Sequence, residues 1–138
     1  MSRDAISLVM PYADQGDLNA ALRAATYIAA YELGRYRIAP LYRCGVVYRF
    51  EPVCDAPEGP ARALPGTCER TLSPRQVIAE GRLADCNTLA PWLAAQRILE
   101  GARCQAIAIP SPTIGGWHCI VRHSNGRIED PSVVLGMR

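Results

Sequence analysis

The chain contains no lysine, and all fifteen of its basic residues are arginine. Thirteen acidic residues offset them, so the formal net charge is only +2, and the arginines are scattered along the sequence. A weak and scattered charge does not form the continuous basic surface that binds nucleic acid. We therefore expect no nucleic-acid partner. Without lysine, the chain also has no side-chain amine for its own cross-linking.

Long hydrophobic runs are absent as well. No apolar run reaches the roughly 20 residues that a membrane helix needs, and residues 1–12 lack the apolar region and cleavage site of a signal peptide. A hydrophobic fraction of 49% with 20% charged residues is typical of a soluble globular protein. We expect no membrane partner, and the length of 138 residues fits one domain over 1–138.

The cysteines lack the spacing of a zinc site, because they form neither a CxxC pair nor a Cys/His cluster. We therefore expect no metal and no cofactor. A disulfide between Cys54 and Cys68 would close a loop of about 15 residues and add roughly 3 kcal/mol. With no secretion signal, we expect that pair to be reduced. The six cysteines are Cys44, Cys54, Cys68, Cys86, Cys104 and Cys119.

The first half of the chain predicts one long helix. Apolar residues recur at helical spacing over 17–33, with Asp17 as the N-cap and Gly34 as the stop. Short strands are expected at 5–10 and at 45–50. The remaining segment, 51–72, is rich in proline and glycine, which is typical of a binding loop, an interface arm or a poorly ordered surface loop.

The second half predicts two helices followed by strands. Ser73 and Gln76 form a capping box for a helix over 74–80. A second helix is expected over 87–100, starting late enough to keep Pro91 in its first turn. Strands are then expected over the ranges 103–109, 117–123 and 127–130, the last two joined by an Asn-Gly turn. The fold class is therefore α+β, with one helix packed on a small antiparallel sheet.

Three residues in this second half have the chemistry of a nucleophilic site. Cys86 is expected beside a helix N-terminus, which favours the thiolate. His118 would start a strand and act as the base, while Asp130 would end the next strand and orient the imidazole. Together they predict a Cys-His-Asp triad for acyl transfer through a thioester.

The segments around these residues resemble the transglutaminase-like branch of the papain-type cysteine enzymes. In that superfamily an Asp-Cys pair opens a helix, a strand carries the histidine, and an Asp-Pro-Ser or Asp-Pro-Thr sequence closes the next strand. The resemblance covers residues 73–135 and implies a papain/transglutaminase-like fold. The chain departs from it at Asn87 and Thr88, where many relatives carry an acidic residue, and at Pro91.

Further site residues follow from the same reasoning. An oxyanion hole requires preorganised donors, and the backbone N–H of Cys86 is the first candidate. The resemblance suggests Gln76 as a second donor, although its capping-box position already explains it. Trp117 is expected either to form a wall of the acyl site or to pack in the core. The loop over 110–116 is expected either to gate the substrate or to serve as an ordinary connection.

Simpler interpretations remain open for each residue. His118 fits a structural hydrogen-bonding role, and Asp130 before a proline is often a turn former. His123 is expected to be exposed near the hairpin turn and to lie on the opposite face from His118. The cysteines expected to be buried and inert are Cys44, Cys104 and Cys119.

Three functions compete at this stage. The first is a cysteine peptidase or amidase that acts on a peptide or protein substrate, with hydrolysis and transamidation both open. The second is an assembly subunit that retains the fold with an idle or single-use site. The resemblance extends to small bacterial and tailed-phage proteins, which implies a location in the bacterial cytoplasm or the virion. The third is a zinc-binding interaction module.

Overall fold

The computed structural model describes residues 7–11, 14–50, 68–111 and 116–138, which form a mixed α+β structure. Its longest elements are two helices and two strands. In chain order the elements are β1 (Ser7–Pro11), α1 (Gln15–Arg35), a 3-10 turn (Leu41–Arg43), β2 (Val47–Tyr48), β3 (Cys68–Leu72), α3 (Pro74–Ala79), β4 (Leu83–Ala84), α4 (Cys86–Leu99), β5 (Cys104–Ser111), β6 (Gly116–His123), β7 (Ile128–Glu129) and α5 (Pro131–Val134).

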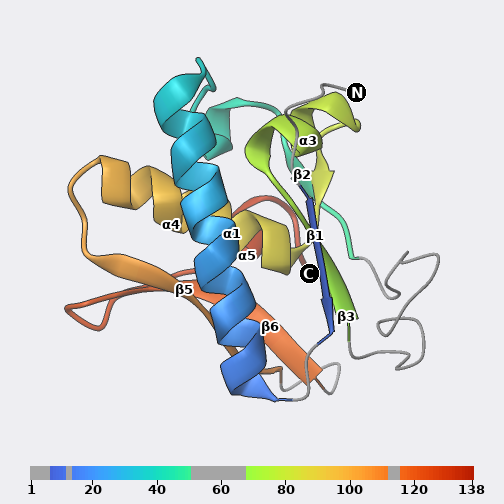
Figure 1. Ribbon diagram of the computed structural model, residues 1–138, viewed down its shortest axis with the longest axis vertical. Coiled ribbons are helices and arrows are strands. Elements are labelled where there is room, and N and C mark those ends of the chain that lie inside the picture. The colour runs from blue at the N-terminus through green and yellow to red at the C-terminus, as the bar shows by residue number, and fades with distance from the viewer. Residues whose placement is uncertain (1–6, 12–13, 51–67, 112–115) are drawn as a thin grey trace.

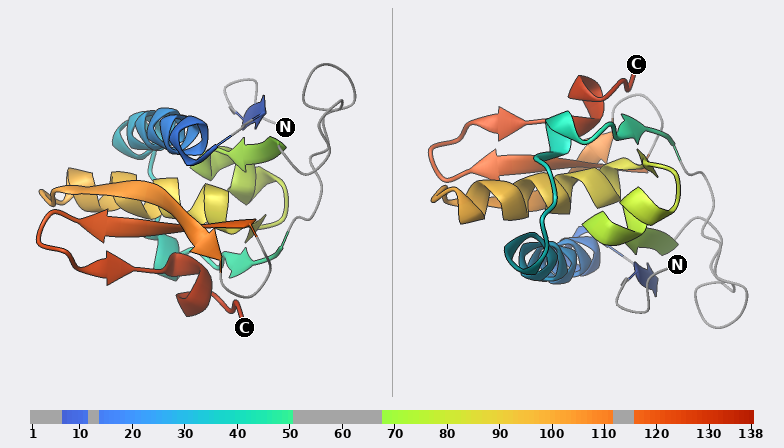
Figure 2. Two further views of the ribbon diagram at one scale, coloured as in Figure 1. Left: turned by 90° about the horizontal axis from the view of Figure 1, so that it is seen from below. Right: turned by 90° about the horizontal axis from the view of Figure 1, so that it is seen from above.

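Helix α4 occupies the middle layer of the molecule. It lies between α1 and the antiparallel sheet β5-β6-β7 (Figures 1 and 2). Leu89, Trp92 and Leu93 of α4 are almost completely buried there. Burial of large apolar side chains on both sides of one helix is a main source of folding free energy. This packing holds α4 against β6.

The long helix is confirmed, but both of its ends differ from the prediction. Asp14 is the N-cap, and its Oδ1 accepts a hydrogen bond from the N–H of Asp17 at 2.9 Å. The predicted cap, Asp17, therefore lies in the first turn. Gly34 does not end the helix, which continues to Arg35 and stops where Tyr36 becomes extended.

The sheet prediction is wrong in two places. Residues 68–72, expected in a loop, form β3 and pair antiparallel with β1, whereas 51–67 lie outside the described residues. The strand expected at 45–50 is only two residues long, and β2 pairs in parallel with β4. These pairings join segments far apart in sequence, so local patterns do not reveal them.

The remaining elements of the second half agree closely with expectation. Ser73 caps α3, accepting a hydrogen bond from the N–H of Gln76 at 3.3 Å. Helix α4 starts one residue earlier than predicted, at Cys86, which places Pro91 in its second turn instead of its first. Strand β7 ends at Glu129, and α5 follows it as an element that the sequence did not predict.

Candidate active site

Cys86 is the first residue of α4. Asp85 is the N-cap, and the N–H groups of Thr88 and Leu89 both donate to its carbonyl oxygen. The positive end of the helix dipole favours a thiolate at such a position. The Cys86 residue is only 8% exposed. The structure therefore confirms the predicted place of Cys86 and adds that it is nearly enclosed.

His118 and Asp130 are joined directly. Nε2 of His118 lies 2.7 Å from Oδ2 of Asp130, and both side chains are partly buried. The other oxygen of Asp130, Oδ1, accepts hydrogen bonds from the N–H groups of Ser132 and Val133, because Asp130 is the N-cap of α5. The aspartate is fixed by this helix cap, and it in turn orients the imidazole.

Cys86 and His118 also meet. Their side chains are hydrogen-bonded, and since Nε2 is engaged by Asp130, Nδ1 is the ring nitrogen left for the sulfur. The Asp130 hydrogen bond, with help from Cys86, raises the pKa of His118 to about 10. Hydrogen bonds from Cys119 and His118 outweigh the effect of burial and lower the pKa of Cys86 to about 5. At neutral pH the pair is a thiolate beside an imidazolium.

Cys119 is a site residue that the sequence did not identify. It is 1% exposed, as expected, but its side chain and its backbone N–H both hydrogen-bond to Cys86. The sequence-based expectation treated it as an ordinary core cysteine because a lone cysteine in an apolar setting is most often buried and inert. Its position next to His118 was the available signal.

The first turn of α4 is anchored to β3. Nδ2 of Asn87 donates to Oγ1 of Thr71 at 3.2 Å, and the N–H of Leu72 donates to Oγ1 of Thr88 at 3.1 Å. All four residues are buried. Asn87 and Thr88 stand where the resemblance would place acidic residues, and here they hold the start of α4 against a neighbouring strand.

The backbone N–H of Cys86 is occupied. It donates to Oδ1 of Asp85 at 2.7 Å, so it binds an oxyanion only after this carboxylate moves away. Tyr48 lies beside the same group: its side chain hydrogen-bonds to Asp85, and its pKa is raised by burial and by the nearby charges of Asp85 and Cys86. The parallel pairing of Tyr48 with Ala84 places it there, which the sequence did not reveal.

Gln76 and Trp117, the two further site residues expected from the sequence, both lie in packed surroundings. Gln76 is 3% exposed in α3, where its N–H takes part in the Ser73 cap. Trp117 is half-buried at the edge of the core, opposite Pro110 in the β5-β6 ladder. Their roles as an oxyanion donor and a site wall stay predictions. Residues 112–115, most of the proposed gating loop, lie outside the described residues.

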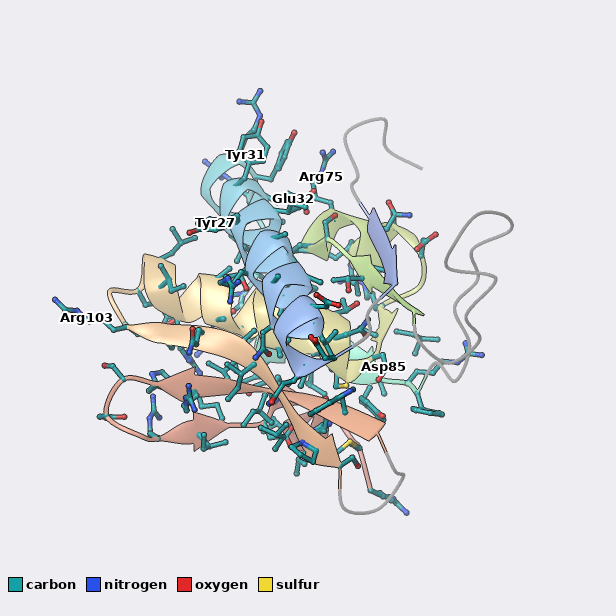
Figure 3. All side chains as sticks on the ribbon, turned by 60° about the horizontal axis from the view of Figure 1, so that its bottom comes forward. Tyr27, Tyr31, Glu32, Arg75, Asp85 and Arg103 are labelled. Atoms are coloured by element: carbon teal, nitrogen blue, oxygen red, sulfur yellow. The ribbon has the colours of Figure 1, made fainter. Side chains whose placement is uncertain are left out.

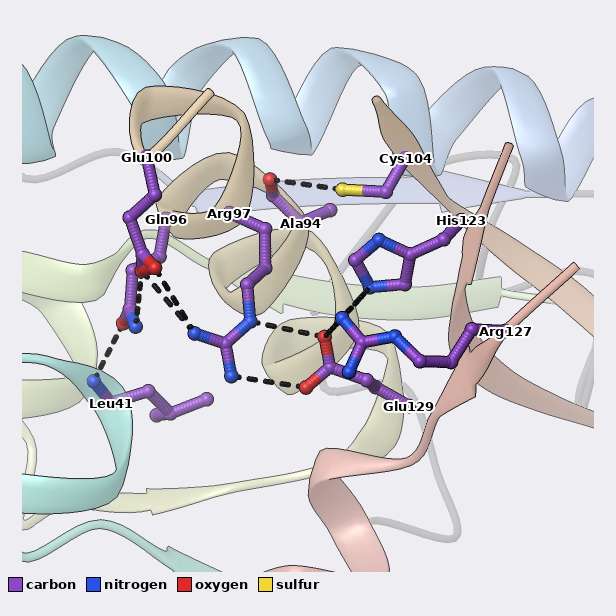
Figure 4. Close-up of polar contacts among 9 residues, drawn as sticks. All are labelled: Leu41, Ala94, Gln96, Arg97, Glu100, Cys104, His123, Arg127 and Glu129. Atoms are coloured by element: carbon purple, nitrogen blue, oxygen red, sulfur yellow. Dashed lines mark hydrogen bonds and ion pairs between the residues drawn. The ribbon is translucent and has the colours of Figure 1, made fainter. Parts of the chain in front are cut away.

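The predicted exposure of His123 is wrong. His123 is 8% exposed, and its Nε2 lies 2.7 Å from Oε1 of Glu129 (Figure 4). Arg97 of α4 donates to both oxygens of Glu129, from Nε and Nη2, each at 3.0 Å. This network joins β6 and β7 to α4. It gives His123 a structural role near the hairpin turn.

Two other cysteines are half-buried, which is less than the full burial predicted. Sγ of Cys44 donates to the Leu41 carbonyl at 3.2 Å, and Sγ of Cys104 donates to the Ala94 carbonyl at 3.6 Å. Burial raises the pKa of both thiols. Cys54 lies outside the described residues, so its state with Cys68 stays a prediction.

Within the part of the chain that the structure describes, no group of three His, Cys, Asp or Glu side chains is arranged to hold a metal ion. No helix in that part is long and apolar enough to cross a membrane. Comparison with protein-family models, with curated proteins and with solved structures finds no match to this chain.

Proposed function

We propose that the chain is a transglutaminase-like cysteine enzyme that transfers an acyl group from a peptide or amide substrate, most simply as a peptidase or amidase. The observation that carries this proposal is the chain of contacts that runs from Cys86 through His118 to Asp130. Its key distance is 2.7 Å between Nε2 of His118 and Oδ2 of Asp130. A helix start for Cys86 and a strand for His118 agree with the arrangement that the resemblance implies, while Asp130 follows the next strand and caps α5.

In this mechanism the Cys86 thiolate attacks the carbonyl carbon of the substrate and forms a tetrahedral intermediate. His118, protonated at neutral pH, gives a proton from Nδ1 to the leaving amine. The resulting thioester is then attacked by water or by a second amine. Asp130 holds the imidazole in place throughout and stabilises its charged form.

The oxyanion step requires a local change. Oδ1 of Asp85 must leave the Cys86 N–H before that donor can bind the developing negative charge. The hydrogen bond from Tyr48 offers this carboxylate a partner other than the Cys86 N–H.

Trapping of the acyl-enzyme tests the proposal without knowledge of the natural substrate. The native protein is treated with an activated ester such as p-nitrophenyl acetate and followed by intact mass and peptide mapping. We expect one acetyl group on Cys86, removed by hydroxylamine, and none on Cys86→Ala. Cys104→Ala is the matched control and should acylate normally. Equal labelling of Cys86, Cys44 and Cys104, or no labelling of Cys86, contradicts the proposal.

An assembly subunit is the second candidate, and one observation favours it. Tyr27 and Tyr31 project from the outer side of α1 and are 77% and 58% exposed (Figure 3). Aromatic residues are enriched where proteins bind one another. For such a subunit, partner binding depends on α1 and is unchanged in Cys86→Ala.

A further inference from the structure

A second thiol lies against the candidate nucleophile. The side chain of Cys119 hydrogen-bonds to the sulfur of Cys86, and both residues belong to the same buried core cluster. Neither cysteine is in a disulfide. The acyl-transfer mechanism requires only one of them, so the position of Cys119 calls for a separate explanation.

The hydrogen bonds of β5 independently fix the direction of the Cys119 N–H. Ala108, its partner in the ladder, gives its N–H to Oδ1 of Asn19 at 2.7 Å and accepts a hydrogen bond from Nε2 of Gln15 at 2.6 Å. Both polar groups of Ala108 thus point toward α1 and away from β6. In an antiparallel ladder this makes Ala108 and Cys119 a non-hydrogen-bonded pair. The N–H of Cys119 therefore points away from β5.

The opposite edge of β6 is open at this position. Among the described residues, β7 pairs with β6 only at Val121 and Arg122. The sulfur of Cys86 lies at the open edge and accepts the hydrogen bond of the Cys119 N–H. From an edge, side chains on both faces of a strand are within reach, which explains how His118 and Cys119 contact the same sulfur.

We propose that Cys86 and Cys119 form a dithiol site that reduces a hydroperoxide and closes to a reversible disulfide. The Cys86 thiolate attacks one peroxide oxygen, the O–O bond breaks, and the leaving oxygen takes a proton from His118. This gives a sulfenic acid and, from hydrogen peroxide, water. The sulfur of Cys119 then displaces the hydroxyl group, which leaves as water with the thiol proton. Two electrons pass from the thiol pair to the peroxide.

The disulfide protects the nucleophile and blocks acyl transfer until a thiol reductant reopens it. Without a nearby thiol, a sulfenic acid at Cys86 can proceed to the sulfinic acid, which ordinary reductants do not reverse. Cys119 is placed to intercept it. This inference does not rest on the proposed acyl transfer, since it needs only the reactive thiol and its neighbour.

The test is peroxide treatment of the reduced full chain at neutral pH, followed by alkylation and peptide mapping. We expect loss of two hydrogen atoms and a cross-linked peptide pair containing Cys86 and Cys119, reversed by dithiothreitol. Cys104→Ser is the matched control and should give the same cross-link. Cys119→Ser should give none, with the Cys86 sulfenic acid trapped by dimedone.

Mapping of the native chain decides the matter even if Cys119→Ser does not fold. Oxidation of Cys86 to a sulfinic acid without the cross-link, a disulfide from Cys86 to any other cysteine, or no oxidation of Cys86 overturns the proposal. Each result is distinguishable from failure of the acylation experiment, which reports on ester attack and not on a second thiol.

Discussion

At the residue scale, Asp130 does two jobs with its two oxygens. Oδ2 binds Nε2 of His118, and Oδ1 caps α5 through the N–H groups of Ser132 and Val133. The first role depends on the carboxylate, because its hydrogen bond with His118 is the largest cause of the raised pKa of His118 and its negative charge adds to that effect. The second role needs only an acceptor atom. Substitution of Asp130 by asparagine or by alanine therefore separates its effect on His118 from its role as a helix cap.

We predict that Asp130→Asn raises the pH midpoint of Cys86 alkylation by about one unit or more, since the imidazolium beside the thiolate loses its charged partner. Because asparagine is also a good N-cap, the free energy of unfolding should change by less than about 0.5 kcal/mol. Asp130→Ala should shift the midpoint similarly and cost about 1 kcal/mol more, from the lost cap. Alkylation profiles and urea unfolding measure the two effects. An unchanged midpoint in both variants would argue against the His118–Asp130 link.

At the element scale, sequence patterns predicted the elements that carry Cys86 and His118. The capping residues and apolar spacing of α4, and the hairpin formed by β6 and β7, are local signals, so Cys86 and His118 were placed correctly. Tyr48 and Cys119 were missed for one reason. Their approach to the site depends on the β2-β4 pairing and on the open edge of β6, which are long-range features.

The ion pair between Arg97 of α4 and Glu129 of β7 also acts at the element scale, because it joins these two elements. We predict that Glu129→Gln lowers the free energy of unfolding by about 1–3 kcal/mol, because it removes a bidentate, charge-assisted pair with Arg97. Glu100→Gln is the matched control: Glu100 also contacts Arg97, but its side chain is half exposed, so a change below about 0.5 kcal/mol is expected. Urea unfolding measures both variants. Equal losses of unfolding free energy in the two variants would show that the Arg97–Glu129 pair stabilises the fold no more than the exposed Arg97–Glu100 pair does.

The stability that the Arg97–Glu129 ion pair contributes depends on pH. Arg97, and then His123, lower the pKa of Glu129 below its ordinary value. The contribution of Glu129 to stability is therefore present above the ordinary glutamate pKa and is lost as the pH falls through the lowered value. The stability difference between native protein and Glu129→Gln should shrink in that acidic range.

At the scale of the whole molecule, the candidate site is assembled from four separate segments, near Tyr48, Cys86, His118 and Asp130. The sequence predicted the α+β class and the approach of Cys86 and His118, because these two residues lie on elements with strong local signals. Asp130 instead caps α5, an element that the sequence did not predict. The sequence also did not predict strand β3 or the engagement of the Cys86 N–H by Asp85. Strand β3 depends on its long-range pairing with β1, whereas the contact of Asp85 with the Cys86 N–H joins neighbouring residues at the start of α4.

The central claim is that Cys86 is a thiolate held beside a protonated His118. The most direct test is the pH dependence of alkylation at every cysteine of the native protein, followed by mass spectrometry, with His118→Ala as the control. The account predicts that Cys86 reacts well below neutral pH, with a midpoint near its pKa of about 5. Cys44 and Cys104 should lag far behind, and His118→Ala should remove most of the difference. If Cys86 reacts no faster than Cys104 at neutral pH, the claim is contradicted.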